Sequence, residues 1–196
     1  MQTAVDILGM VKEISRTYDR DPAHSEKVVD FSLAIFDDLQ KLHRCGSNER
    51  SLLKIAGFLH DIGYSQSDQR PHNKASRDMI LEMEIPGISD TEKLTAALVA
   101  RYHRGELPDA SQHQHFASLS VGRRDTVEWL AGILRVADGL DCGHTDAVRK
   151  LAVEVSNSQL IFSLDAKKDC REQIKRAREK EELLVIKSGK EIKYYC

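Results

Sequence analysis

The sequence contains an adjacent histidine and aspartate, His60-Asp61, directly before Ile62-Gly63. Residues 52–59, before the pair, are mostly apolar and have helical spacing, so a buried scaffold rather than a solvated face carries the pair. Consecutive residues of a helix point about 100° apart. Both side chains can therefore reach one metal ion, or bridge two, only where the helix ends at a pocket. The pair is a candidate for metal ligation.

Four further residues extend this candidate site. Asp138 is the lone carboxylate within the apolar run 129–140, where an ionised carboxylate needs a strong partner such as a metal cation. His24 lies on the apolar stripe of a predicted helix, His103 follows another long apolar helix, and His72 lies in a loop. Imidazole and carboxylate groups together suit Mn, Fe, Zn or Mg, and the lack of thiolate ligands argues against a structural zinc site.

Each of these residues also has a structural interpretation. A single buried histidine is more often a core residue with satisfied hydrogen bonds than a ligand. A buried aspartate most often caps a helix or pairs with an arginine, and Arg101 and Arg135 are available for such a pair. The combination of a histidine, a His-Asp pair and an aspartate on three successive long helices favours a metal site.

The elements that carry these residues are predicted to be helices up to about residue 150. Apolar residues recur every three to four positions over residues 4–14 and 24–42. Asp21-Pro22 is a typical helix start, and Ser89-x-x-Glu92 is a capping box that opens a further helix. Other helices are expected over residues 47–62, 74–84 and 125–141.

The pattern changes after residue 150. Residues 151–155 and 160–164 alternate in polarity around a Ser-Asn-Ser turn, which predicts a β-hairpin. Residues 167–182 form a charged helix whose charges are interpreted as a solvated face. Residues 183–187 and 191–195 are expected to form two more short strands.

Composition places the protein in a broad class. The 196 residues suffice for one compact, mainly α unit, in which a helical domain (1–150) carries a small C-terminal α+β element (151–196). Lys and Arg number 29 against 31 Asp and Glu, a balance that argues against a nucleic-acid-binding protein. No apolar run approaches the roughly 18 residues of a membrane span. The four separated cysteines are expected to be reduced thiols of a cytoplasmic protein.

The ordered motifs resemble a known superfamily. His24 before a helix, then His60-Asp61, then Asp138 in RVADGLD is similar to the signature of HD-superfamily metal-dependent phosphohydrolases. More closely, HSEKVVDFSLAIFDDL, LLKIAGFLHDIGYSQSD, IPGISDTEKLTAALVARYHRGELP, LAGILRVADGLD and VEVSNSQLIFSL resemble the C-terminal HD-type domain of the exopolyphosphatase and guanosine pentaphosphate phosphohydrolase family. The resemblance covers roughly residues 20–195 and implies a stand-alone HD-domain helical bundle. The N-terminal actin-like domains of that family are not expected in these 196 residues, so its polyphosphatase activity does not carry over.

The resemblance also implies a set of site residues. The implied ligands of one metal ion are His24, His60, Asp61 and Asp138. The implied ligands of a second ion are His72 and His103, with Asp61 bridging the two ions as a catalytic residue. The candidates for binding phosphate oxygens are Lys74, Arg70, Arg101 and Arg104, each of which has surface solvation or structural pairing as its alternative.

The expected activity is that of a metal-dependent phosphohydrolase. One or two divalent ions (Mn, Fe, Zn or Mg) would activate water to cleave a phosphoester or phosphoanhydride of a small molecule such as a nucleotide. The alternative is a non-catalytic, metal-containing module that regulates a partner or senses a nucleotide. No membrane partner is expected, and formation of a homodimer is left open. His113, His115 and His144 are expected at the surface.

Overall fold

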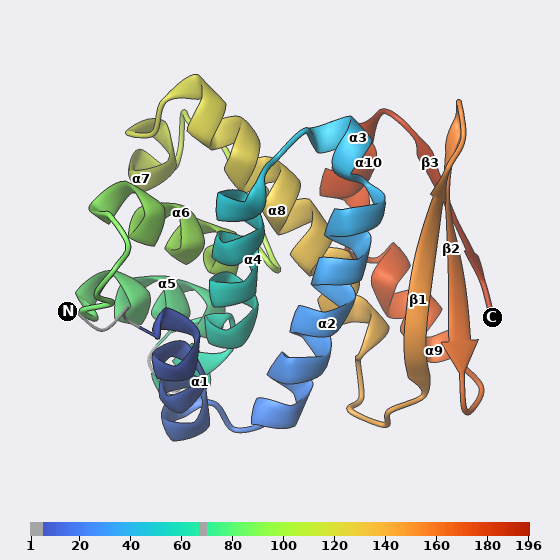
Figure 1. Ribbon diagram of the computed structural model, residues 1–196, viewed down its shortest axis with the longest axis horizontal. Helices are drawn as coiled ribbons and strands as arrows, with labels where there is room; N and C mark the ends of the chain where they lie inside the picture. Colours follow the sequence, from blue (N-terminus) through green and yellow to red (C-terminus); the bar gives the residue numbers. More distant parts are fainter. Residues whose placement is uncertain (1–5, 67–69) are drawn as a thin grey trace.

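Helices make up most of the protein and enclose a buried core (Figure 1). The computed structural model describes residues 6–66 and 70–196. In chain order the elements are α1 (Ile7–Tyr18), α2 (Pro22–Asp38), α3 (Gln40–His43), α4 (Ser47–Leu59), η1 (Ile62–Gln66), α5 (His72–Glu82), α6 (Asp90–Arg101), α7 (Gln114–Ala117), α8 (Val121–Leu140), β1 (Val148–Val155), β2 (Gln159–Ala166), α9 (Arg171–Arg178), α10 (Glu182–Ser188) and β3 (Glu191–Tyr195). Helix α4 packs against α2 and α6, and α8 packs against all three. The expected mainly α fold with a small C-terminal β element is confirmed.

Two helices that position candidate ligands begin at the capping signals of the sequence: α2 carries His24, and α6 ends just before His103. The side chain of Asp21 accepts a hydrogen bond from the backbone N–H of His24 at 3.2 Å, at the start of α2. Before α6, the carboxylate of Glu92 accepts the backbone N–H of Ser89 at 2.8 Å, and the Ser89 hydroxyl accepts the N–H of Glu92 at 3.3 Å. These caps fix where α2 and α6 begin. Helix α1 begins at Ile7, and residue 4 lies outside the described residues.

The turn after α4 is fastened to α5. The hydroxyl of Ser76 donates to the carbonyl of His60 at 2.6 Å and accepts the backbone N–H of Gly63 at 2.9 Å. A Cβ at Gly63 would lie 2.1 Å from the carbonyl oxygen of His72, so only glycine allows this approach. The turn that carries His60 and Asp61 is thereby held against the first residue of α5, which is His72.

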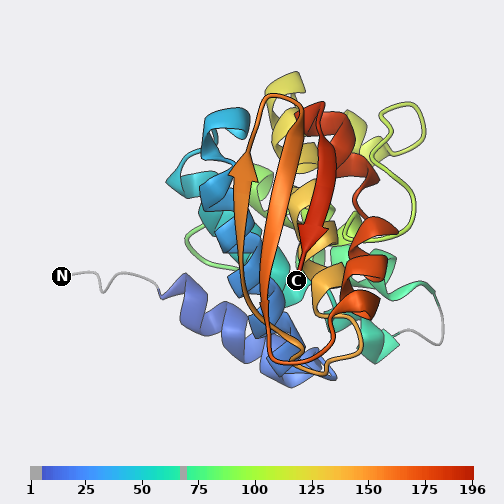
Figure 2. The ribbon, with the colours of Figure 1, turned by 90° about the vertical axis from the view of Figure 1, so that its right-hand side faces the viewer.

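The C-terminal strands form a three-stranded sheet beside α2 (Figure 2). Strands β1 and β2 are antiparallel and pair Val155 with Leu160, which confirms the predicted hairpin. Strand β3 adds to β2 in the parallel direction, giving the order β1-β2-β3. Buried side chains on one face, among them Phe162, join the core.

Residues 182–188 form helix α10, so the predicted strand over residues 183–187 is wrong. Leu183 and Leu184 are buried where α10 contacts α8, whereas Ile186 remains 61% exposed. A short apolar run has the same composition whether it is a strand or one face of a helix. Contact with α8 decides in favour of the helix here.

One glycine brings α9 directly against α8. A Cβ at Gly139 would lie 2.7 Å from the Cα of Ala177, closer than any side chain allows. Because Gly139 follows Asp138 in the sequence, the C-terminal element contacts α8 beside a candidate metal ligand.

The cysteines are not all free thiols. Cys170 and Cys196 form a disulfide with their Cα atoms 6.6 Å apart, so the expectation of four reduced thiols is wrong for this pair. Cys45 and Cys142 are free. Within the part of the chain that the structure describes, none of the helices combines the length and the apolar character of a membrane span.

Candidate metal centre

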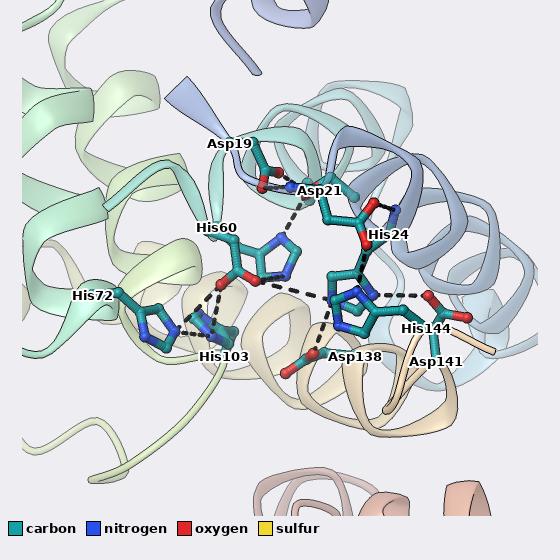
Figure 3. Close-up of polar contacts among 12 residues, drawn as sticks. Asp19, Asp21, His24, His60, His72, His103, Asp138, Asp141 and His144 are labelled. Atoms are coloured by element: carbon teal, nitrogen blue, oxygen red, sulfur yellow. Dashed lines mark hydrogen bonds and ion pairs between the residues drawn. The ribbon is translucent and has the colours of Figure 1, made fainter. Parts of the chain in front are cut away.

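His24 of α2 lies between two carboxylates, Asp138 of α8 and Asp141, which directly follows α8 (Figure 3). The Nε2 atom of His24 lies 3.3 Å from Asp138 Oδ1 and 4.0 Å from Asp61 Oδ2. Its other ring nitrogen, Nδ1, donates to Asp141 Oδ2 at 2.8 Å. His24 and the three aspartates are all buried. The structure therefore brings His24 close to Asp61 and Asp138, two of the residues expected to share a metal ion with it.

Both carboxylate oxygens of Asp61 have histidine neighbours, and Figure 3 shows His72 and His103 together on one side of the cluster and His24 on the other. The Oδ2 atom of Asp61 is 3.5 Å from His60 Nε2. Its Oδ1 atom is 3.3 Å from His72 Nε2 and 3.5 Å from His103 Nε2. The Nε2 atoms of His72 and His103 are 3.3 Å apart. The structure thus brings together all six residues that the sequence predicted as metal ligands.

Hydrogen bonds to the main chain orient two of these rings. His60 Nδ1 lies 2.7 Å from the carbonyl oxygen of Gly57, and His103 Nδ1 lies 2.7 Å from that of Ala100. A carbonyl oxygen only accepts, so Nδ1 carries the proton in both rings. In the neutral rings Nε2 then presents a lone pair to the cluster, as a metal-ligating histidine requires.

The cluster fits a cation. His60 Nε2 and Asp61 Oδ1 are buried, and neither has a hydrogen-bond partner among the described residues. Ligand atoms of His24, His60 and Asp138 lie within 4.8 Å of one another, as do those of His60, Asp61 and His103. A buried polar atom without a partner costs about 1–3 kcal/mol. A bound divalent ion would satisfy these atoms at once.

The charges of the metal-free cluster follow from its contacts. Burial disfavours a charged His24, but hydrogen bonds with Asp138 and Asp141 raise its pKa to about 10. Burial opposes ionisation of Asp61 too, but the nearby imidazoles of His60, His72 and His103 hold its pKa well below the usual range. Burial lowers the pKa of His103. Near neutral pH the cluster therefore combines ionised carboxylates with a neutral His103, and a proton on His24 supplies positive charge.

A small cavity of about 170 Å³ opens on this cluster, and Arg104 lines it. The other three residues predicted to bind phosphate lie elsewhere. Arg70 pairs with an aspartate of α5 at 2.5 Å, Arg101 is buried and pairs with Glu106 at 2.7 Å, and Lys74 lies 3.7 Å from the same carboxylate. A larger, open hollow of about 720 Å³ beside α7 has none of the candidate ligands in its wall.

Several residues of the site were not identified from the sequence. The cavity is also lined by Tyr64, His144, Arg176 and Lys180. His144 lies at the surface, as expected, yet its ring stacks on His24 with centroids 4.2 Å apart. Asp141 could have been identified from the sequence as a residue of the site, because it lies one helical turn after Asp138. His113 and His115 do not line the cavity.

Comparison with known proteins identifies the family. The family model of the Ppx/GppA phosphatase, domain III, matches residues 9–183. The comparison with curated proteins gives no match. The matched region contains the whole His/Asp cluster and the cations that line its cavity. This chain therefore belongs to the domain III family of the Ppx/GppA phosphatases.

Proposed function

We propose that the protein is an HD-type, metal-dependent phosphohydrolase that cleaves a phosphoester or phosphoanhydride of a small molecule such as a nucleotide. One observation carries the proposal: buried histidine and aspartate atoms converge on a cavity without fully satisfying one another. Membership of a phosphatase family supports the reaction class.

The six clustered residues would divide between two ions. His24, His60, Asp61 and Asp138 would hold one divalent ion, and His72 and His103 would hold a second. Each oxygen of Asp61 has different histidine neighbours, which supports a bridging role for this carboxylate. Bound Mn, Fe, Zn or Mg supplies Lewis-acid chemistry and lowers the pKa of water.

The protein's own residues prepare the site before a ligand arrives. Asp141 fixes the ring of His24, and the carbonyls of Gly57 and Ala100 fix His60 and His103. Such partners orient metal ligands, and their loss typically weakens metal binding about 10–100-fold. Arg104 lines the cavity, where its planar donors would bind phosphate oxygens.

The shape of the site supports a small substrate. The 170 Å³ cavity shares Asp61, Tyr64 and His144 with a neighbouring cavity of about 210 Å³. Pockets for drug-sized ligands are roughly 300–1,000 Å³. The first cavity therefore suits the phosphoryl group, and the second suits the leaving group.

Metal content and hydrolysis, measured together, test this function. We expect His60→Ala and Asp61→Ala to lose bound metal and phosphate release from a panel of nucleotides and pyrophosphate, whereas exposed His115→Ala keeps both. Unchanged metal content in either cluster variant contradicts the metal centre. Metal bound by the unmodified protein without turnover would instead favour a regulatory or nucleotide-sensing module.

A further inference from the structure

The C-terminal element brings positive charge to the cavity beside the cluster. Lys180 follows α9 and contacts Asp138, and Arg176 lies one turn earlier on the same helix. Both line the cavity, as does Arg104 from the loop after α6. We propose that Lys180, Arg176 and Arg104 form an anion subsite that binds phosphate oxygens of the substrate. This inference rests on the proposed function and deepens it.

The charge balance of the cavity favours an anion. The lining contains three fixed cations, which are the residues of the subsite, and two carboxylates, Asp61 and Asp138. In the proposed function both carboxylates neutralise divalent ions. Lys180 and Arg104 then remain to attract a phosphate group in the cavity of about 170 Å³, and Arg176 adds donors although Glu172 and Glu179 offset part of its charge.

Two of the cations have donors left for a ligand. The ammonium of Lys180 has three N–H donors, and Asp138 accepts from it. Arg176 pairs with Glu172 at 3.0 Å and with Glu179 at 2.9 Å, but its guanidinium has five donors. Lysine binds a phosphate as a point charge, whereas arginine offers two parallel N–H groups.

A buried arginine holds the two cationic segments together. Arg135 of α8 donates from Nε to the carbonyl of Lys180 at 3.1 Å. From Nη1 it donates to the carbonyls of Tyr102 at 3.0 Å and Gly105 at 3.2 Å, which flank Arg104. One guanidinium thus fixes Lys180 relative to the turn that carries Arg104. Such preorganisation lowers the cost of ordering when an anion binds.

Lys175 of α9 is an ordinary surface cation with which Lys180 can be compared. Lys175 is 63% exposed and lies 3.9 Å from Glu172, whereas the Lys180 side chain is 26% exposed and reaches a buried carboxylate. Lys175 does not line the cavity. Lys175 shares Glu172 with Arg176, but its replacement changes the net charge equally without removing a residue that lines the cavity, which makes it a matched control.

Titration with inorganic phosphate tests the subsite. Phosphate is added to the full chain loaded with Mn²⁺, its affinity is measured by calorimetry, and Mn²⁺ content is measured separately. We expect Lys180→Gln and Arg176→Gln to weaken phosphate binding by about tenfold or more, the low end for a hydrogen bond between charged groups. Lys175→Gln should stay within about twofold, as for an exposed ion pair. Mn²⁺ content should be the same in all variants.

Three results would overturn the subsite. If Lys180→Gln keeps its Mn²⁺ and binds phosphate as the unmodified protein does, Lys180 does not touch the anion. If Lys180→Gln loses Mn²⁺, the lysine acts by positioning Asp138. If the unmodified protein binds Mn²⁺ and hydrolyses nucleotides but has no phosphate affinity, the subsite fails while the proposed function stands. Failure to bind Mn²⁺ would refute the proposed function itself.

Discussion

A proton and a metal ion compete for the same nitrogen of His24. In the metal-free protein Nε2 lies 3.3 Å from Asp138, and Nδ1 is held by Asp141 at 2.8 Å. Despite burial, these hydrogen bonds raise the pKa of His24 to about 10. A metal ligand must be unprotonated, so metal binding has to release the proton from Nε2.

The raised pKa of His24 sets the size and the sign of the pH dependence of metal binding. At pH 7 the protonated form exceeds the neutral form by about 1,000-fold, a competition equal to ~4 kcal/mol of metal-binding free energy. Metal affinity should therefore rise by about tenfold per pH unit between pH ~6.5 and ~8.5. The raised pKa of His24 also stabilises the folded, metal-free protein. This contribution to the free energy of unfolding is fully present below about pH 6.5 and is lost as the pH rises towards about 10.

Competition against a coloured chelator measures the affinity across this pH range. Calorimetry in buffers of different ionisation enthalpy should detect the release of about one proton from His24 for each ion that binds at this position. Asp141→Asn removes one of the carboxylates that raise this pKa and should make the slope shallower, whereas Lys175→Gln should not change it. An affinity that does not change with pH would show that no proton leaves a ligand and would contradict a protonated His24 in the metal-free protein.

Two further substitutions test how the C-terminal element is held. Gly139→Ala should lower the free energy of unfolding by roughly 1–3 kcal/mol in urea, because its Cβ would press on backbone atoms of Ala177. Gly122→Ala, where a Cβ meets nothing within 4 Å, should be neutral or slightly stabilising, and equal effects at both positions would contradict this reasoning. Arg135→Met should cost about 2–4 kcal/mol, because three backbone carbonyls lose a charged donor, and it should weaken phosphate binding by the Mn²⁺-loaded protein. Unchanged phosphate affinity in that variant would limit Arg135 to a structural role.

Local signals explain which parts of the fold could be predicted from the sequence. The caps at Asp21 and Ser89 act within one helical turn, so the sequence contains both partners of each hydrogen bond. The hairpin is equally local, because a three-residue turn joins its two alternating strands. Helix α10 is different: its apolar residues suit either structure, and only contact with α8, some fifty residues earlier in the chain, selects the helix.

The candidate metal ligands could be predicted from the sequence, whereas the cations that the C-terminal element brings to the cavity could not. A histidine or aspartate within an apolar helix has few ordinary roles, so residue type alone drew attention to His24, Asp61 and Asp138. A lysine on a charged helix has an ordinary role at every position. Lys175 and Lys180 cannot be told apart until α9 is placed against Gly139. That glycine follows Asp138, so one turn of α8 supplies both a candidate ligand and the contact that brings Lys180 to it. A substitution that displaces α9 should therefore disturb the anion subsite before it disturbs the histidine ligands, which lie on or just after α2, α4, α5 and α6 rather than on α9.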